Sequence, residues 1–178
     1  MIFVPPAFVT ERLTLRRPAL SDAEAIFRNY AQDPEVTRYL LWRPHGGVAE
    51  TESFLRESME RWEEGTEFAW VITPRESDEA IGMIAVRPDE FKAELGYVLA
   101  RSHWGKGLMT EAGMAVMDWL KGEPGIYRVW ATCNLENGAS ARVLEKLGMQ
   151  REGLLRRWHI WPNLSAEPQD AWMYARVR

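Results

Sequence analysis

Apolar and polar residues change their spacing along the chain, and this spacing predicts where strands and helices lie. Strict alternation is typical of a half-buried strand, whereas apolar residues three and four positions apart are typical of a helix with one buried face. We expect strands over residues 10–16, 68–73, 80–87, 93–99, 127–133, 149–160 and 169–177. We expect helices over residues 21–32, 49–64, 108–120 and 140–146, and a short helical piece that begins at residues 33–34.

Local signals support several of these boundaries. Ser21-Asp22-Ala23-Glu24 reads as a capping box that opens the first helix. Asp33-Pro34 reads as an N-cap followed by a first-turn proline. Gly65 and Gly148 directly follow apolar helical stripes and predict the ends of those helices. Residues 74–79 separate two strand patterns and therefore predict a hairpin.

The order of the elements predicts the fold class. Strands come first, helices and strands then alternate, and strands return at the end, which favours a mixed α/β or α+β sheet with helices on both faces. With 178 residues, of which 46% are hydrophobic, the chain is long enough to bury a proper core. The sequence shows no repeat, low-complexity stretch or long linker, so we expect one domain over residues 1–178.

Composition narrows the classes of function. The net charge of −4 argues against general nucleic-acid binding, which needs a basic face. No run approaches the roughly 18–20 apolar residues of a membrane span, and Met-Ile-Phe-Val-Pro-Pro at the start lacks the pattern of a secretory signal. Cys133 is the only cysteine, which favours a reducing cytoplasm. The three scattered histidines and this cysteine show no metal-site spacing.

Residues 101–112 carry the most informative chemistry. Gly105-Lys106-Gly107 lies between the expected strand 93–99 and the expected helix 108–120. A helix start offers unpaired N–H groups and the positive end of a dipole, and glycines let the backbone approach an anion closely. The spacing matches neither the P-loop nor the dinucleotide-binding fingerprint. The sequence therefore predicts an anion-binding loop of another kind.

A second motif follows about thirty residues later, as Asn134-Leu135-Glu136-Asn137-Gly138-Ala139-Ser140. On its own it reads as an Asx turn and an N-cap, because Asn and Ser are preferred at both places. Together with the glycine loop, it resembles the GNAT superfamily of acyl-CoA-dependent N-acetyltransferases, and most of all the branch of the RimJ and RimL protein N-terminal acetyltransferases. Further resemblance lies in residues 10–16, 41–44, 94–97, 151–153 and 170–176.

The resemblance implies a mixed, mostly antiparallel central sheet with helices on both faces and a splayed strand pair that holds acetyl-CoA, without a metal. Main-chain amides across the glycine loop would hold the pyrophosphate, and pantetheine would lie beside the end of strand 93–99. The cofactor residues implied in this way are Val98, Leu99, Trp104, Gly105, Lys106, Gly107, Leu108, Met109, Thr110, Asn134 and Asn137. The usual loop pattern falls on Trp104, Gly107 and Met109, of which the first and last depart from it; Trp104 cannot offer the positive charge of arginine.

Acetyl transfer by direct attack is what the resemblance implies for the reaction. Ser140 is then expected to protonate the departing sulfur, although it could instead cap a helix start. Glu94 is the leading candidate for the base because alternation places it on one strand face with Gly96 and Val98. Glu67 is the second candidate, and either carboxylate could instead be ion-paired. Cys133 is a minor alternative as a nucleophile.

Proton energetics bears on the acceptor. Freeing an α-amine at pH 7 costs roughly 1.4 kcal/mol, against roughly 4.6 kcal/mol for lysine, so a site without a strong base suits an N-terminus better. The acceptor groove is expected to be walled by Tyr39, Trp42 and Arg43 and, from the C-terminal hairpin, by Trp158, His159 and Trp161. Core packing or a homodimer contact would also explain such aromatics.

We therefore expect a cytoplasmic N-acetyltransferase that acts on protein or peptide N-termini. A small-molecule amine, such as an amino acid, polyamine or antibiotic, is the alternative acceptor. An acidic wall from Glu50, Glu52 or Glu57 would favour a polycation, and an open groove between the aromatic segments would favour a peptide. Because Trp104 differs from the usual residue of the phosphate-loop pattern, a non-catalytic acyl-CoA-binding sensor is the third candidate function.

Overall fold

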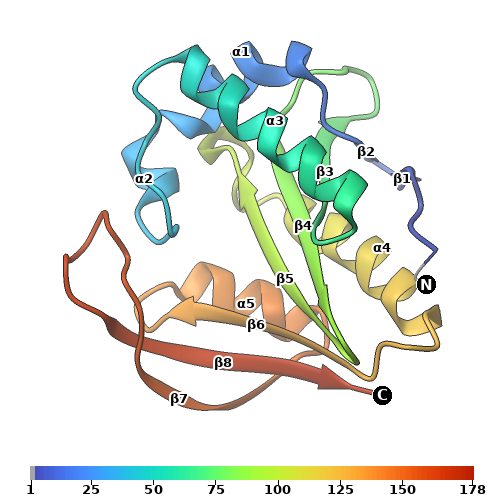
Figure 1. The fold of residues 1–178 in the computed structure, drawn as a ribbon, viewed down its shortest axis with the longest axis vertical. Helices are drawn as coiled ribbons and strands as arrows, with labels where there is room; N and C mark the ends of the chain where they lie inside the picture. The colour runs from blue at the N-terminus through green and yellow to red at the C-terminus, as the bar shows by residue number, and fades with distance from the viewer. Residues whose placement is uncertain (1–2) are drawn as a thin grey trace.

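The computed structural model describes residues 3–178 and contains one eight-stranded sheet with helices packed on both faces (Figure 1). The strand order is β1-β2-β3-β4-β5-β6-β8-β7, and every neighbouring pair is antiparallel except β5 and β6. The strands are β1 Ala7–Val9, β2 Leu13–Arg16, β3 Phe68–Pro74, β4 Gly82–Asp89, β5 Lys92–Leu99, β6 Arg128–Asn134, β7 Gln150–His159 and β8 Gln169–Val177. The mixed, mostly antiparallel sheet expected from the sequence is confirmed.

The helices follow the apolar stripes closely. They are α1 Ala23–Ile26, α2 Pro34–Thr37, α3 Val48–Glu64, α4 Leu108–Gly122 and α5 Gly138–Lys146. Helical turns flank α1 on both sides, so the helical segment runs continuously from Leu20 to Ala31. Asp33 caps α2 by accepting the Glu35 N–H at 2.9 Å, as the Asp-Pro pair predicted.

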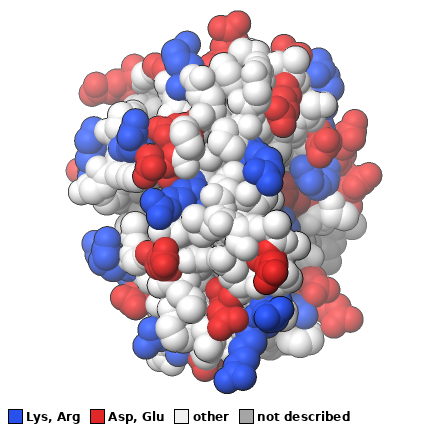
Figure 2. Space-filling view, turned by 90° about the vertical axis from the view of Figure 1, so that its left-hand side faces the viewer, with Lys and Arg blue, Asp and Glu red and all other residues white. Residues whose placement is uncertain are grey.

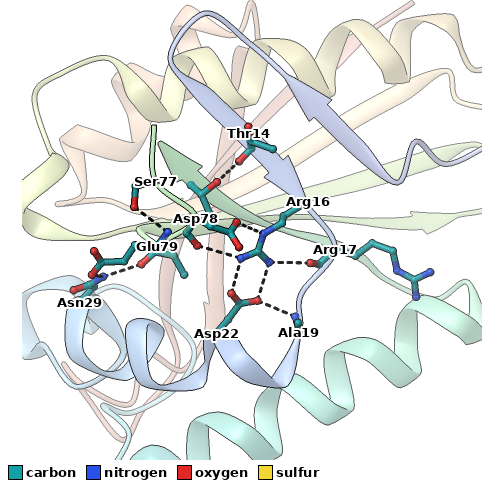
Figure 3. A network of polar contacts seen from close by, with 11 residues as sticks. Thr14, Arg16, Arg17, Ala19, Asp22, Asn29, Ser77, Asp78 and Glu79 are labelled. Carbon is teal, nitrogen blue, oxygen red and sulfur yellow. Dashed lines mark hydrogen bonds and ion pairs between the residues drawn. The ribbon is translucent and has the colours of Figure 1, made fainter. Parts of the chain in front are cut away.

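The predicted capping box at Ser21-Asp22-Ala23-Glu24 is wrong in position. The helical segment already begins at Leu20, and Asp22 Oδ2 accepts the Ala19 N–H at 2.8 Å. Asp22 is held in turn by Arg16, whose Nη2 lies 2.7 Å from Asp22 Oδ1 and whose Nε lies 2.7 Å from Asp78 Oδ1 (Figure 3). This pairing raises the pKa of Arg16. The start of this helix is therefore fixed by the ion pairs of Arg16, and the local sequence pattern does not predict these pairs.

The core consists of two apolar clusters on opposite faces of the sheet. Trp70 and Ile72 of β3 belong to the cluster that contains the apolar residues of α4 and α5, whereas Ala69 and Val71 belong to the cluster that contains Ile26 of α1. We call these the α4 face and the α1 face. Because both faces are covered, β3 reads as a continuous buried run rather than as an alternating strand.

Strands β5 and β6 separate after a short parallel pairing. Only residues 92–94 of β5 pair with residues 128–130 of β6, and beyond this point the two strands diverge (Figure 1). The outer neighbours β4 and β8 stay paired to the ends, through Leu99 and Asn134 respectively. The splayed strand pair is therefore present, and the inner edges of both strands border an open gap.

Candidate active site

A cavity of about 970 Å³ occupies the gap between β5 and β6. Its lining brings together most of the residues singled out in the sequence, namely Val98, Leu99, Trp104, Gly105, Gly107, Leu108, Met109, Thr110, Asn137, Ser140, Glu94, Glu67, Tyr39 and Trp42. Lys106, Asn134 and Trp158 lie outside this lining. The glycine loop and the Asn-x-x-Ser helix, although distant in sequence, thus open onto the same space.

The glycine loop has the geometry of an anion cradle. Gly105 and Gly107 have φ values of +73° and +75°, a left-handed backbone that side chains with a Cβ rarely adopt. The first hydrogen bond inside α4 runs from the Glu111 N–H to the Gly107 carbonyl at 3.0 Å. The amides of the first helical turn therefore point out of the helix end toward the cavity. The side chains of Leu108 and Met109 are buried, so these two residues can offer only their backbone.

Trp104 ties the loop to the end of β5. Its indole Nε1 donates to the Leu99 carbonyl at 2.7 Å. Trp104 therefore supplies no positive charge, but its hydrogen bond fixes the glycine loop to the end of β5. The side chain of Lys106 is exposed, and its carbonyl accepts a hydrogen bond from Arg12 Nη1 at 3.0 Å.

Arg12 and Glu111 form a clamp beside this loop that the sequence did not predict. Arg12 Nε donates to Glu111 Oε2 at 2.7 Å, and the Thr10 hydroxyl donates to Glu111 Oε1 at 2.6 Å. Burial opposes ionisation, but the bonds from Thr10 and Arg12 outweigh it and lower the pKa of Glu111. Residues 10–16 were matched to the family without any role being assigned to them. The partner at Glu111 lies 99 residues away from Arg12, beyond the reach of local pattern.

Ser140 faces the cavity from α5. The helix begins at Gly138 rather than at Ser140, and Asn137 is its N-cap, because Asn137 Oδ1 accepts the Ser140 N–H at 3.1 Å. The Ser140 hydroxyl is thereby left for Tyr97, whose Oη lies 2.8 Å from Ser140 Oγ. Burial raises the pKa of Tyr97, so its hydroxyl stays protonated at neutral pH. Tyr97 lies within residues 94–97, which contribute to the family resemblance, but the sequence did not assign it to the site.

The two candidate carboxylates share one arginine. Glu67 is 4% exposed, and its Oε2 lies 2.5 Å from Arg87 Nε. Glu94 Oε2 lies 3.8 Å from Arg87 Nη1. Burial raises the pKa of Glu94, and Arg87 only partly offsets this effect. Glu94 is therefore a stronger base than an ordinary surface carboxylate.

Aromatic side chains line one side of the cavity. Of the residues expected as walls, Tyr39, Trp42, His159 and Trp161 belong to the lining. Arg43 and Trp158 lie outside it, and Trp158 is 48% exposed and packs edge-on against His159. Strand alternation alone could not show this, because the β7–β8 pairing shifts register between Leu155 and His159.

Three histidines belong to the cavity lining, namely His45, His103 and His159. His159 Nε2 lies 3.0 Å from the hydroxyl of Thr132 on β6, and burial lowers the pKa of this histidine. His45 precedes α3; its Nδ1 lies 2.8 Å from the Thr51 hydroxyl, and its ring packs against Trp42 with centroids 5.0 Å apart.

Asn134 and Cys133 end β6 with local roles. Asn134 Oδ1 accepts the Glu136 N–H at 3.0 Å, which is the Asx turn that the pattern also allowed. Cys133 lines the cavity, and burial raises the pKa of its thiol to about 11. A thiol that stays protonated at neutral pH is a poor nucleophile, so direct attack by the amine is favoured over a cysteine-linked intermediate.

Within residues 3–178, no helix combines the length and the apolar character needed to cross a membrane. Over the same range, no group of three or more His, Cys, Asp and Glu side chains is arranged to hold a metal ion.

Comparison with known proteins adds to this geometry. The family described as acetyltransferase (GNAT) domain matches residues 12–150. An N-acetyltransferase of Bacillus licheniformis named p20 is 36% identical over 150 residues, which cover 83% of this chain and 84% of the relative.

Two solved structures share the fold. The microcin C7 self-immunity acetyltransferase MccE, in complex with acetyl-CoA and AMP, superposes with a TM-score of 0.88 at 23% identity and covers 98% of both chains. RimL, a ribosomal L7/L12 α-N-protein acetyltransferase in complex with coenzyme A, gives a TM-score of 0.83 at 23% identity and covers 96% of both chains. At these identities the likeness shows the fold alone.

Proposed function

The chain belongs to the GNAT acetyltransferase family and is an acyl-CoA-dependent N-acetyltransferase, and from this premise we propose that it acetylates the α-amine of protein or peptide N-termini in the manner of the RimJ/RimL branch. RimL, with which it shares the fold, is named as an α-N-protein acetyltransferase. The observation that carries the proposal is the single cavity, which opens on one side to the glycine loop and on the other to an aromatic wall.

The charges around the acceptor side support a singly charged amine better than a polycation. Of the three glutamates that could have formed an acidic wall, only Glu57 lines the cavity, and it lies 3.7 Å from Arg61. Glu50 accepts the Gly46 N–H, and Glu52 pairs with an arginine one turn along the same helix. On the face shown in Figure 2, blue and red side chains are interspersed rather than gathered into a patch of one sign. The lining also contains Glu35, Glu67 and Glu94, but Arg61 and Arg87 pair with Glu57, Glu67 and Glu94, so the acidic side chains do not form a wall of one sign.

The residues present fit acetyl-CoA as the acyl donor. The amides from Gly105 to Thr110 would hold its diphosphate, and Val98 and Leu99 would lie beside the pantetheine arm where β5 leaves β6. Asn137 lines the same space and would contact that arm. The donor supplies a thioester, whose carbonyl carbon is the electrophile.

The side chains in the cavity could take a proton from the incoming amine and give one to the departing sulfur. Glu94, with Glu67 as the second candidate, would take a proton from the incoming ammonium directly or through a water, which frees the nitrogen lone pair for attack. The Ser140 hydroxyl would give its proton to the departing sulfur and regain one from the Tyr97 hydroxyl at 2.8 Å, and water would return a proton to Tyr97 when the products leave. We place this enzyme in the cytoplasm and treat residues 1–178 as one domain.

The experiment is a panel of three acceptors incubated with acetyl-CoA and followed by mass spectrometry. The panel contains a peptide with a free α-amine, the same peptide with a blocked α-amine and an internal lysine, and spermidine. We expect acetyl-CoA-dependent mass gain on the first peptide alone. Turnover confined to spermidine or another small amine would instead support a small-molecule enzyme. Tight binding of coenzyme A without turnover of any amine would support the sensor.

A further inference from the structure

One side chain joins the two segments that wall the acceptor side. Asn163 lies in the loop between β7 and β8, and its Nδ2 donates to the carbonyl oxygens of Thr37 and Trp42, each at 2.7 Å. The two contacts cross 126 and 121 residues of sequence. A primary amide carries two N–H donors, so both are used in this bridge. Figure 1 shows the α2–α3 connection and the β7–β8 loop approaching each other at the left of the molecule.

Both anchors of the bridge are themselves fixed. On the β7–β8 side, the N–H groups of Leu164 and Ser165 both donate to the Trp161 carbonyl at 2.9 Å, and Trp161 is 2% exposed. On the other side, Thr37 ends α2 and is fully buried. Because both segments are rigid, the hydrogen bonds of Asn163 fix the position of one segment relative to the other.

The residues next to each anchor face the cavity. Tyr39 and Trp42 line it from the α2–α3 connection, and His159 and Trp161 line it from the β7–β8 hairpin. Asn163 itself lies outside the lining, so it can influence an acceptor only through these neighbours. An open groove between the two aromatic segments is the feature that would favour a peptide acceptor. In the structure, Asn163 joins these two segments through its hydrogen bonds to Thr37 and Trp42.

We propose that Asn163 is a positioning residue that sets acceptor specificity by holding the two aromatic walls at a fixed separation. The inference rests on the proposed function, because it takes the aromatic side of the cavity to be the acceptor site. The two walls, held at this separation, restrict the size of the group that can lie next to the reacting amine. In the peptide case, this group is the first side chain. Asn163 contacts neither the glycine loop nor Ser140, so neither cofactor affinity nor the chemical step depends on it.

The test compares Asn163→Asp and Asn163→Ala with a matched control, Asn29→Ala. Aspartate keeps the size of asparagine but loses both donors, so it removes the bridge without opening a hole. Asn29 is also a bridging amide, whose Nδ2 donates to Glu79 Oε1 at 2.9 Å and to the Ala80 carbonyl at 2.8 Å, and it lies outside the cavity lining. Kinetics would be measured on peptides that differ only in a small or a bulky first residue.

We expect both Asn163 variants to raise the KM for the small-residue peptide by about tenfold and to lose the preference over the bulky one. Both should leave kcat and the KM for acetyl-CoA within about twofold of wild type, and Asn29→Ala should leave all these values unchanged. Hydrogen exchange gives a readout besides activity: amides of residues 37–45 should exchange faster in Asn163→Asp than in wild type.

Unchanged peptide preference in both Asn163 variants would overturn the inference, as would an equal change in Asn29→Ala. Should wild type acetylate no amine at all, the proposed function fails separately. Unchanged exchange of residues 37–45 in Asn163→Asp would still refute the bridge as the element that fixes the walls.

Discussion

The Tyr97 hydroxyl lies 2.8 Å from the Ser140 hydroxyl, which connects the splayed strand β5 to the first turn of α5. The single Tyr97 proton can be donated either to Ser140 Oγ or to the Ser140 carbonyl oxygen, which lies 3.2 Å away. Because burial raises the pKa of Tyr97, this proton is present at neutral pH. Two hydroxyls in series form a path along which a proton can reach the leaving sulfur.

Replacement of Ser140 tests this path. Ser140→Ala should lower kcat by about 100-fold, the lower range for loss of a general acid, while the affinity for acetyl-CoA changes by less than about threefold. Tyr97→Phe should have a smaller effect, and the double variant should be no worse than Ser140→Ala, because the two hydroxyls act as one unit. Steady-state kinetics with calorimetry checks all three. Wild-type turnover in Ser140→Ala would remove Ser140 from the mechanism.

The clamp at the glycine loop gives a second prediction. Arg12 donates to the Lys106 carbonyl and is itself held by Glu111. Removal of the Arg12 side chain should therefore let the glycine loop adopt more than one conformation. Arg12→Ala should weaken coenzyme A binding by about tenfold. Arg17→Ala is the matched control, because Arg17 forms an exposed ion pair with Glu63 instead. Calorimetry that shows equal loss of affinity in both variants, or no loss in either, would contradict a specific role for the clamp.

The pH profile tests Glu94. A base acts only when it is unprotonated, and burial raises the pKa of Glu94 above its ordinary value of 4.5. The kcat of wild type should therefore fall with decreasing pH at a higher pH than an exposed carboxylate would give. Glu94→Gln should lower kcat and abolish this limb of the profile. A limb that survives in Glu94→Gln but is lost in Glu67→Gln would transfer the role to Glu67.

The pairing of β4 with β5 depends on a close backbone contact at Gly82. A Cβ atom at this position of β4 would lie 2.5 Å from the Val98 carbonyl oxygen of β5. Gly82→Ala should therefore lower the free energy of unfolding by about 1–3 kcal/mol. Gly153→Ala in β7, where a Cβ would meet nothing within 4 Å, is the control and should change it by less than about 1 kcal/mol. Denaturant unfolding that gives equal values for both variants would refute the contact.

The sequence pattern predicted the elements that depend on interactions between residues close together in the chain. The stripe of α3 and its end at Gly65, with a φ of +72°, follow from periodicity and from a left-handed cap. The first helix was placed less well, because Asp22 serves Ala19 and Arg16 rather than the predicted capping box. Arg16 is also paired with Asp78, which comes from the segment between β3 and β4, and no window around Asp22 contains Asp78.

The site divides in the same way. The glycine loop and the Asn-x-x-Ser helix carried a recognisable spacing, so both were found in the sequence. Arg12 and Asn163 were missed because each acts on a backbone carbonyl about 90 residues or more away, and a carbonyl leaves no signature in sequence. Trp158 was expected in the lining together with His159 and Trp161, and it alone of these three lies outside, because the register shift before His159 cannot be read from alternation.

The most direct test of the account is the binding of coenzyme A to Gly107→Val, measured by calorimetry beside Gly65→Val. Both glycines have left-handed backbone, with φ values of +75° and +72°, so a β-branched residue strains either position to a similar degree. Only Gly107 lies in the glycine loop. The account predicts that the two variants melt at similar temperatures and that Gly107→Val alone loses affinity for coenzyme A. Wild-type affinity in Gly107→Val would contradict it.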